Sequence, residues 1–499
     1  MNLTQALEQF RSFEETSYAL SHAMSVLYVD GDTAAPKQSY EGRGRALGYL
    51  SGLMYEAVSS PSFREAVETV LQQKDSASPE DLRKAELYRE DLLDSILFTK
   101  EECMANTQLV NEANMVWHDA KEKSDYSLFA PFLEKLIAYQ KTFAERKDSS
   151  RPAYDVLLDS FEKGTGTKTL DPFFELLRQE LTPVIHAVSE KPQPRTDFLH
   201  RVYPIHLQRD FSDRLMAMMG IDRACCNISE TEHPFTDGVN KWDVRITTKY
   251  IETDPASSMY SVIHEGGHAL YELGVKDEYQ FTRLAGGGSM GIHESQSRFY
   301  ENLIGRSLPF SRAVFPVVKE LFPEQVKDVT AEEWYRGINM AQPSLIRTEA
   351  DELTYPLHVL IRYEIEKKMF GGDVKVQDLP ALWNELYRTY LGVTPSCDRE
   401  GILQDSHWSG ASFGYFPSYA LGSAYGVQML HNMEKDVDVW DAAEKGDLRP
   451  ITAWLREHVH QYGQFFTSPQ VLTACGVDPF DPNVYVRYLK DKYTELYNL

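Results

Sequence analysis

The chain has 499 residues, and its 51 Lys and Arg against 75 Asp and Glu give a formal charge of 51 − 75 = −24. This acidic balance lacks the basic surface that nucleic-acid phosphates or an anionic membrane require, so neither partner is expected. Hydrophobic residues make up 42% of the chain and aromatic residues 12%, which is enough apolar surface for a folded core and excludes a disordered protein.

The first residues, MNLTQALEQFRSFEE, contain neither a basic segment nor an apolar segment of the kind found in signal peptides. Nowhere does the sequence approach the roughly 18 consecutive apolar residues of a membrane span. The five cysteines are odd in number and form no CxxC spacing, which favours reduced thiols. We therefore expect a cytoplasmic protein.

Most of the chain shows apolar residues at intervals of three and four, which predicts a mainly α fold. The clearest helical segments are Thr4–Tyr28, Gly44–Val58, Pro61–Gln73, Pro79–Thr99, Lys100–Glu122, Ser127–Arg146, Pro172–Ser189 and Thr348–Phe370. Pro356 is expected to kink or interrupt the last of these.

One segment departs from the helical pattern. Residues Trp242–Tyr250 (WDVRITTKY) alternate apolar or β-branched side chains with charged or polar ones, which predicts a strand. The preceding Thr236–Gly238 has the composition of a turn. A small sheet is therefore expected just before the most informative helix of the chain.

That helix contains His264-Glu265-Gly266-Gly267-His268, an H-E-x-x-H pattern. Histidines four residues apart share a helical face, and their imidazoles can bind one zinc ion. Glu265 is then placed to act as a general base toward a water molecule. Two adjacent glycines inside a helix cost about 1 kcal/mol each relative to alanine, which indicates close approach of substrate or of another element.

A catalytic zinc ion takes three protein ligands and keeps one position open. Glu294 is the best candidate for the third ligand and His293 the second, because both lie at the predicted start of the next helix. The intervening Ala285–Ser289 lacks the lysine of a phosphate-binding loop. It is expected to be a flexible connector or the mobile rim of a cleft.

With these residues in place, the chain resembles the carboxypeptidase Taq family of metallocarboxypeptidases, which are HEXXH gluzincins. Six blocks match in order: His233–Phe235 (HPF), Asp243–Thr247 (DVRIT), His264–His268 (HEGGH), His293–Arg298 (HESQSR), Ile346–Asp351 (IRTEAD) and Gly414–Tyr419 (GYFPSY). The likeness extends over essentially the whole chain, although the N-terminal part matches in helical character and length only.

The resemblance implies a large helical body with a deep cleft and a small antiparallel β-sheet beside the HEXXH helix. We expect one two-lobed domain over 1–499, with a helical part at about 1–200 and a zinc-site part at about 201–499. The resemblance also implies a homodimer that removes single residues from peptide C-termini with broad preference. Its cofactor would be one zinc ion per chain, replaceable by cobalt, held by His264, His268 and Glu294, with Glu265 as the base.

Such an enzyme must bind the terminal carboxylate of its substrate, and the planar guanidinium of arginine does so with two hydrogen bonds. Arg347 is the preferred candidate, and the alternative is a structural salt bridge with Glu349, Asp351 or Glu352. Arg245 is the competing candidate. Its strand is also a candidate to pair with an extended substrate, as edge strands do, or to present a solvated face.

Four further residues are candidates around the substrate. A phenol aimed at the developing oxyanion would stabilise it, and Tyr419 is the first choice because it follows His407 by twelve residues, an interval similar to that in related helical metallopeptidases. Tyr415 is the second choice, and aromatic packing is the alternative for both tyrosines. His407 would contact the substrate backbone, and His233 would line the cleft or cap the sheet.

Partners for the zinc histidines are expected as well, with Glu301 and Asp351 as candidates. Two other functions compete with a carboxypeptidase. One is a related helical zinc oligopeptidase that cleaves internal bonds and needs no carboxylate clamp. The other is a non-catalytic peptide-binding protein, which the intact Glu265 disfavours.

Overall fold

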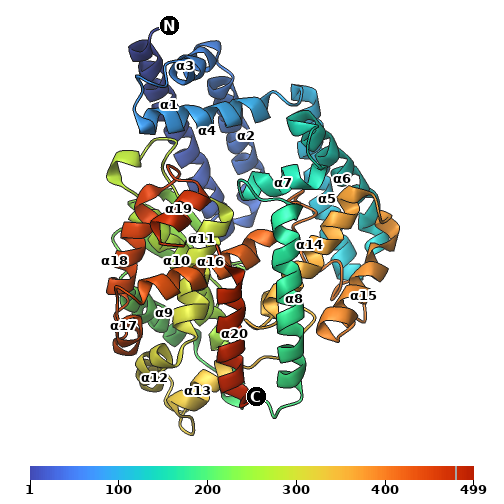
Figure 1. Ribbon diagram of the computed structural model, residues 1–499, viewed down its shortest axis with the longest axis vertical. Helices are drawn as coiled ribbons and strands as arrows, with labels where there is room; N and C mark the ends of the chain where they lie inside the picture. Colours follow the sequence, from blue (N-terminus) through green and yellow to red (C-terminus); the bar gives the residue numbers. More distant parts are fainter. Residues whose placement is uncertain (478–479) are drawn as a thin grey trace.

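The computed structural model describes residues 1–477 and 480–499. Most of these residues lie in helices (Figure 1), and three strands form one small sheet. The first eight helices are α1 (Leu3–Thr33), α2 (Tyr40–Val58), α3 (Pro61–Gln72), α4 (Pro79–Ser95), α5 (Lys100–Lys123), α6 (Tyr126–Asp148), α7 (Ala153–Phe161) and α8 (Thr167–Ser189). The central helices are α9 (Ile205–Met219), α10 (Pro255–Gly274), α11 (Met290–Arg298), α12 (Leu308–Leu321) and α13 (Ala331–Ile338). The last are α14 (Tyr355–Gly371), α15 (Leu379–Leu391), α16 (Pro417–Met433), α17 (Val439–Lys445), α18 (Arg449–His458), α19 (Ser468–Ala474) and α20 (Pro482–Tyr497). The predicted mainly helical fold class is confirmed.

Proline and capping residues explain where helices begin. α3 and α4 start at Pro61 and Pro79, where the missing N–H costs nothing. The helix predicted over 348–370 begins only at Tyr355, with Pro356 in its first turn, so the proline starts the helix instead of kinking it. The carboxylate of Asp351 accepts hydrogen bonds from the backbone N–H groups just before this helix. Asp351 therefore orders the turn that leads into α14.

The sheet contains β1 (Cys226–Glu230), β2 (Thr236–Asn240) and β3 (Asp243–Thr248) in the order β1-β3-β2. β3 confirms the predicted strand. It pairs with β2 in antiparallel and with β1 in parallel orientation, so the sheet is mixed and not purely antiparallel as expected. The prediction of a turn at Thr236–Gly238 is wrong, since these residues lie in the edge strand β2, where pairing on one side suffices.

In the described ranges two main hydrophobic cores of different size hold the helices in place, beside a third cluster of only four buried residues. The smaller one joins α1, α3 and α4 at the top of Figure 1 through buried side chains that include Phe10, Phe63 and Tyr88. The larger one extends from Ala113 to Tyr497 and includes the sheet and α10. In the described ranges all five cysteines are free. Among the helices of these ranges, none combines the length and the apolar composition of a membrane span.

A buried carboxyl group joins three segments of the larger core. Glu366 on α14 accepts hydrogen bonds from the Tyr154 hydroxyl (2.9 Å), the Trp408 indole N–H (2.8 Å) and the Gly414 backbone N–H (2.8 Å). Burial raises the pKa of Glu366 to about 7. The folded protein therefore holds a proton here over a pH range in which the unfolded chain has lost it.

This raised pKa predicts a pH-dependent stability. Relative to a Glu366→Gln variant, the wild-type protein is expected to lose roughly 3 kcal/mol of unfolding free energy as pH rises from about 4.5 through 7. Below that window both the folded and the unfolded carboxyl are protonated, so the contribution is fully present there. Urea unfolding of both proteins at pH 4.5 and 8 measures the difference. If the unfolding free energies of the two proteins change with pH in parallel, Glu366 does not have a raised pKa.

Candidate active site

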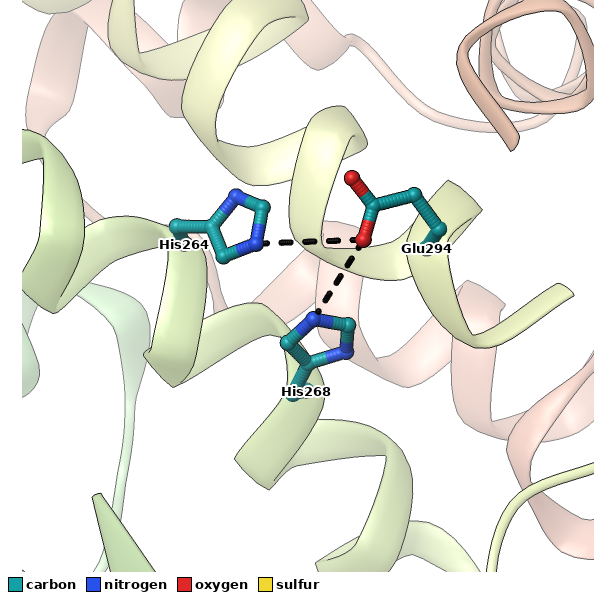
Figure 2. Close-up of side chains that lie close together, drawn as sticks. All are labelled: His264, His268 and Glu294. Carbon is teal, nitrogen blue, oxygen red and sulfur yellow. Dashed lines mark ion pairs between the residues drawn. The ribbon is translucent and has the colours of Figure 1, made fainter. Parts of the chain in front are cut away.

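Two helices packed against each other, α10 and α11, bring three metal-type donors together. The Nε2 atoms of His264 and His268 on α10 lie 3.8 and 3.6 Å from Glu294 Oε2 on α11, and the three side chains converge (Figure 2). Bonds of about 2.1 Å meeting at a tetrahedral angle place ligand atoms roughly 3.4 Å apart. Two imidazoles and one carboxylate with this spacing fit a divalent metal ion. His293, the alternative third ligand, lies outside the cluster.

The close packing of α11 against α10 depends on Gly267. A Cβ atom at this position would lie 2.6 Å from the backbone oxygen of Gln296 and 2.8 Å from the Cα of Ser297. Both contacts are with backbone, which cannot rotate away. The glycine that the sequence marked for close approach of another element therefore admits the helix that carries Glu294.

Gly267→Ala is expected to push α11 away from α10. Overpacking of this kind costs typically 1–3 kcal/mol, and displacement of Glu294 would also weaken metal binding. Gly44→Ala on α2 is the matched control, because a Cβ there meets nothing within 4 Å. It should stabilise the protein by about 0.5–1 kcal/mol. Thermal unfolding should show a lower melting temperature than wild type for Gly267→Ala and a higher one for Gly44→Ala. Changes of the same sign would contradict this packing of α11 on α10.

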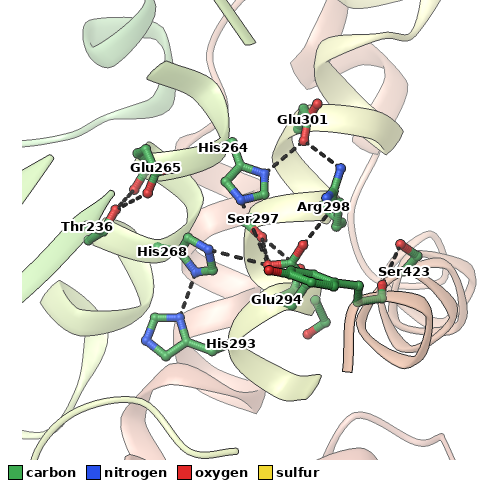
Figure 3. A network of polar contacts seen from close by, with 12 residues as sticks. Thr236, His264, Glu265, His268, His293, Glu294, Ser297, Arg298, Glu301 and Ser423 are labelled. Atoms are coloured by element: carbon green, nitrogen blue, oxygen red, sulfur yellow. Dashed lines mark hydrogen bonds and ion pairs between the residues drawn. The ribbon is translucent and has the colours of Figure 1, made fainter. Parts of the chain in front are cut away.

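The first histidine is oriented by Glu301, which was one of the two predicted partners. Glu301 lies in the π-helical segment Phe299–Gly305 that continues α11, and its Oε2 is 2.8 Å from His264 Nδ1 (Figure 3). Although burial opposes it, the positive charges of Arg298 and Arg306 help to hold the pKa of Glu301 well below its usual range. Arg298 also donates to Glu294 Oε1 at 2.7 Å. Ion pairs and hydrogen bonds from Glu301 and Arg298 thus hold the side chains of His264 and Glu294 in position.

The base candidate Glu265 lies beside this cluster on α10. Its carboxylate accepts a 2.6 Å hydrogen bond from the Thr236 hydroxyl on β2 (Figure 3), and burial raises its pKa. The edge strand of the small sheet is therefore in direct contact with the candidate base. The sequence analysis does not identify Thr236, because it predicts a turn at this position.

The predicted clamp Arg347 is buried in a charged cluster. Its guanidinium donates to Asp405 Oδ1 at 2.8 and 3.0 Å and to the Tyr355 hydroxyl at 3.0 Å. Arg362 binds the other oxygen of Asp405 at 2.7 Å. The ion pair is therefore made with Asp405 and not with Glu349, Asp351 or Glu352. Asp405 has no spacing relation to Arg347 that a sequence would reveal.

Aromatic side chains lie next to this cluster. The Tyr419 hydroxyl in the first turn of α16 is 3.2 Å from His407 Nε2, and the ring centroids of Tyr415 and Tyr419 are 5.1 Å apart. Burial, with smaller effects that include the charge of Glu294, raises the pKa of Tyr419 and keeps the phenol protonated. Burial lowers the pKa of His407 to about 4, so its imidazole is neutral at pH 7. Arg347 lies 5.1 Å from the Tyr419 ring.

Two candidates lie elsewhere. Arg245 is paired with Asp243 at 2.8 Å within β3, which is the central strand. The expectation that this strand adds an extended substrate is therefore wrong, because β1 and β2 already occupy both of its edges. His233 is exposed in the segment between β1 and β2.

Comparison with known proteins agrees with this geometry. A family model described as carboxypeptidase Taq (M32) metallopeptidase matches residues 9–493. "Carboxypeptidase 1" of Bacillus subtilis (strain 168) is 39% identical over 481 residues, covering 96% of each chain. "Thermostable carboxypeptidase 1" of Pyrococcus furiosus is 36% identical over 505 residues, covering 98% of each. The crystal structure of the M32 carboxypeptidase from Deinococcus radiodurans R1 is 33% identical and superposes with a TM-score of 0.95 over 99% of this chain and 100% of that one.

The family match covers nearly all of the chain, and the relatives match over almost their full length. The resemblance inferred from the six blocks is confirmed, and with it the mainly helical fold and the metal-dependent carboxypeptidase class. The chain is a metallocarboxypeptidase and belongs to the carboxypeptidase Taq (M32) family of metallopeptidases.

Proposed function

We propose that this enzyme uses one zinc ion per chain, held by His264, His268 and Glu294, to release single amino acids from the C-termini of peptides with broad specificity. The observation that carries the proposal is the convergence of these three donors beside a buried carboxylate, Glu265. When bound, the ion supplies a Lewis acid for the scissile carbonyl and lowers the pKa of a water molecule. Cobalt suits the same donors.

In this mechanism Glu265 takes a proton from the attacking water and delivers it to the leaving amine. The Thr236 hydroxyl orients the carboxylate of Glu265. The phenol of Tyr419, or that of Tyr415, donates a hydrogen bond to the oxyanion, which is supported by the raised pKa values of both groups. His407 contacts the substrate backbone and orients Tyr419 through their hydrogen bond.

Arg347 is proposed to bind the terminal carboxylate. Support comes from the charge balance of its cluster, in which Arg347 and Arg362 share one partner, Asp405, and leave a net charge of 2 − 1 = +1. A buried net positive charge attracts an anionic terminus. Arg245 remains the competing candidate, although its ion pair with Asp243 weakens the case, and His233 is proposed to line the cleft.

Further parts of the proposal concern the substrate path and the assembly. The outer edge of β2 is proposed to pair with the extended peptide, in place of β3, because β2 is an edge strand and contacts Glu265.

We also propose a cytoplasmic homodimer of two-lobed chains. The free cysteines suit the reducing compartment.

The test is mass spectrometry of the products of one N-blocked peptide, offered as the free acid and as the C-terminal amide, with and without a chelator. Sequential loss of single C-terminal residues from the free acid alone, abolished by chelation and restored by zinc or cobalt, is the expected result. Internal cleavage of both forms would replace the proposal with a zinc oligopeptidase. No cleavage with any metal would replace it with a non-catalytic peptide-binding protein.

A further inference from the structure

The second zinc-binding histidine candidate is held by an unusual partner, another histidine. His268 Nδ1 lies 2.7 Å from His293 Nδ1 (Figure 3). On its far side, His293 Nε2 lies 2.8 Å from Glu272 Oε1, which also accepts the backbone N–H of Gly287 at 2.9 Å. A chain of three side chains therefore leads from the metal cluster through His293 to Glu272, one helical turn further along α10.

The chemistry of imidazole fixes the direction of these hydrogen bonds. If His268 offers Nε2 to the metal, its proton is on Nδ1, and His293 Nδ1 must accept that proton's hydrogen bond. The proton of neutral His293 is then on Nε2 and is donated to Glu272. The carboxylate is an acceptor only, so it excludes the opposite arrangement, in which two N–H groups would face each other between the histidines.

Two glycines leave room for the side chains of His293 and Glu272. A Cβ atom at Gly287 would lie 2.5 Å from His293 Cδ2, and a Cβ atom at Gly238 on β2 would lie 2.7 Å from Glu272 Oε2. Backbone from the glycine loop and from the edge strand therefore covers both members of the pair. The loop over Ala285–Ser289, expected to be a flexible connector or a mobile rim, contributes a hydrogen bond and close contacts to this arrangement.

Glu272 also borders a cavity of about 630 Å³ between α1, α4, β2 and the loop at 280–286. Asp91 on α4 lines the same cavity, but its carboxylate is bound by Arg283. Among the acids of this cavity, Glu272 is thus the one with a described contact to His293. Asp91 offers a matched control with the same charge.

We propose that Glu272 is a positioning residue for the metal site, which sets the tautomer and ring orientation of His268 through His293. The proposal rests on the proposed metal site. Partners of this kind that lie behind a metal-binding histidine typically contribute 10–100-fold to metal affinity. This role also accounts for the glycine at position 287, where a Cβ atom would collide with the ring of His293.

The experiment is a Zn²⁺ titration of the metal-free protein against a chromophoric chelator, with no peptide present. Glu272→Ala is expected to weaken zinc binding by about 10–100-fold. Glu272→Gln keeps an oxygen acceptor and should recover part of that loss. Asp91→Asn should bind zinc within about twofold of wild type. If Glu272→Ala binds zinc as tightly as Asp91→Asn does, the proposal is wrong.

A double-mutant cycle separates positioning from a general loss of structure. In a His293→Phe background, Glu272→Ala should have no further effect on zinc affinity, because the link that it acts through is gone. If the double variant loses as much zinc affinity as the two single variants combined, the proposal is wrong. It is also wrong if the single variants lose zinc affinity equally and their metal-free forms have a strongly lowered melting temperature. Since no peptide is used, failure of the peptidase assay would refute the proposed function alone and leave this result standing.

Discussion

Glu265→Gln is expected to retain bound zinc and to lower kcat by about 10²–10⁴-fold. The amide has nearly the shape of the carboxylate and can still accept the Thr236 hydrogen bond, so the fold of α10 should be unchanged. It cannot take a proton from water, and the step that generates the nucleophile is lost. Single-turnover kinetics on a free-acid peptide, together with metal analysis of the purified variant, measure both halves of the prediction.

Glu278→Gln is the matched control, because Glu278 is an exposed glutamate that follows the same helix. It should leave both kcat and metal content unchanged. If Glu265→Gln lost its zinc, the loss of activity would say nothing about proton transfer. If it kept zinc and cleaved peptide at the wild-type rate, Glu265 would not be the base.

Asp405→Asn is expected to destabilise the protein by about 3–5 kcal/mol, the usual cost of breaking a buried ion pair from one side. Asp405 is the shared partner of two buried arginines, and Arg362 is fully enclosed. The asparagine removes the negative charge and leaves both guanidinium groups without compensation. Chemical denaturation at pH 7 measures the change in unfolding free energy.

The same ion pairs predict the pH dependence of this effect. Although burial opposes it, the guanidinium groups of Arg347 and Arg362 hold the pKa of Asp405 well below its usual range. The stability that the carboxylate contributes is therefore present above the unfolded pKa of about 3.9 and is lost as pH falls below it. The gap between wild type and Asp405→Asn should narrow in acid.

Glu41→Gln provides the comparison for an exposed ion pair. Glu41 and Arg45 are both largely exposed on α2, and such pairs contribute about 0–1 kcal/mol. A cost for Asp405→Asn no larger than that for Glu41→Gln would show that the cluster around Arg347 is solvated. The proposal that it attracts a peptide carboxylate would then lose its main support.

The three candidate metal ligands His264, His268 and Glu294 are the part of the site that local sequence largely predicts. The spacing of His264 and His268 follows from the helical period alone, and the capping and apolar pattern after Ser289 indicates the helix that carries Glu294. Arg298 was detectable too, since it stands four residues after Glu294 and contacts it. The sequence did not reveal that His293 turns toward His268, which only the packing of α11 on α10 decides.

The surroundings of the residues proposed to contact substrate were predicted less well. Asp405 was missed as the partner of Arg347, and Thr236 was assigned to a turn. The strand of Arg245 was considered as a site for pairing with substrate, but it is the central strand. Each error concerns a contact with another segment of the chain. The pattern of a strand shows its alternation but not its neighbours, so neither the strand order nor the partners of a buried charge can be derived from it.

The sequence by itself determined the helical class, the two histidines, the glutamate between them and the family, because these depend on local periodicity and on residues a few positions apart. The tertiary structure decided the mixed sheet, the ion pair of Arg347 with Asp405 and the chain from His268 through His293 to Glu272. These depend on close packing between distant segments, where one missing Cβ atom at Gly267 or Gly287 decides which side chains meet.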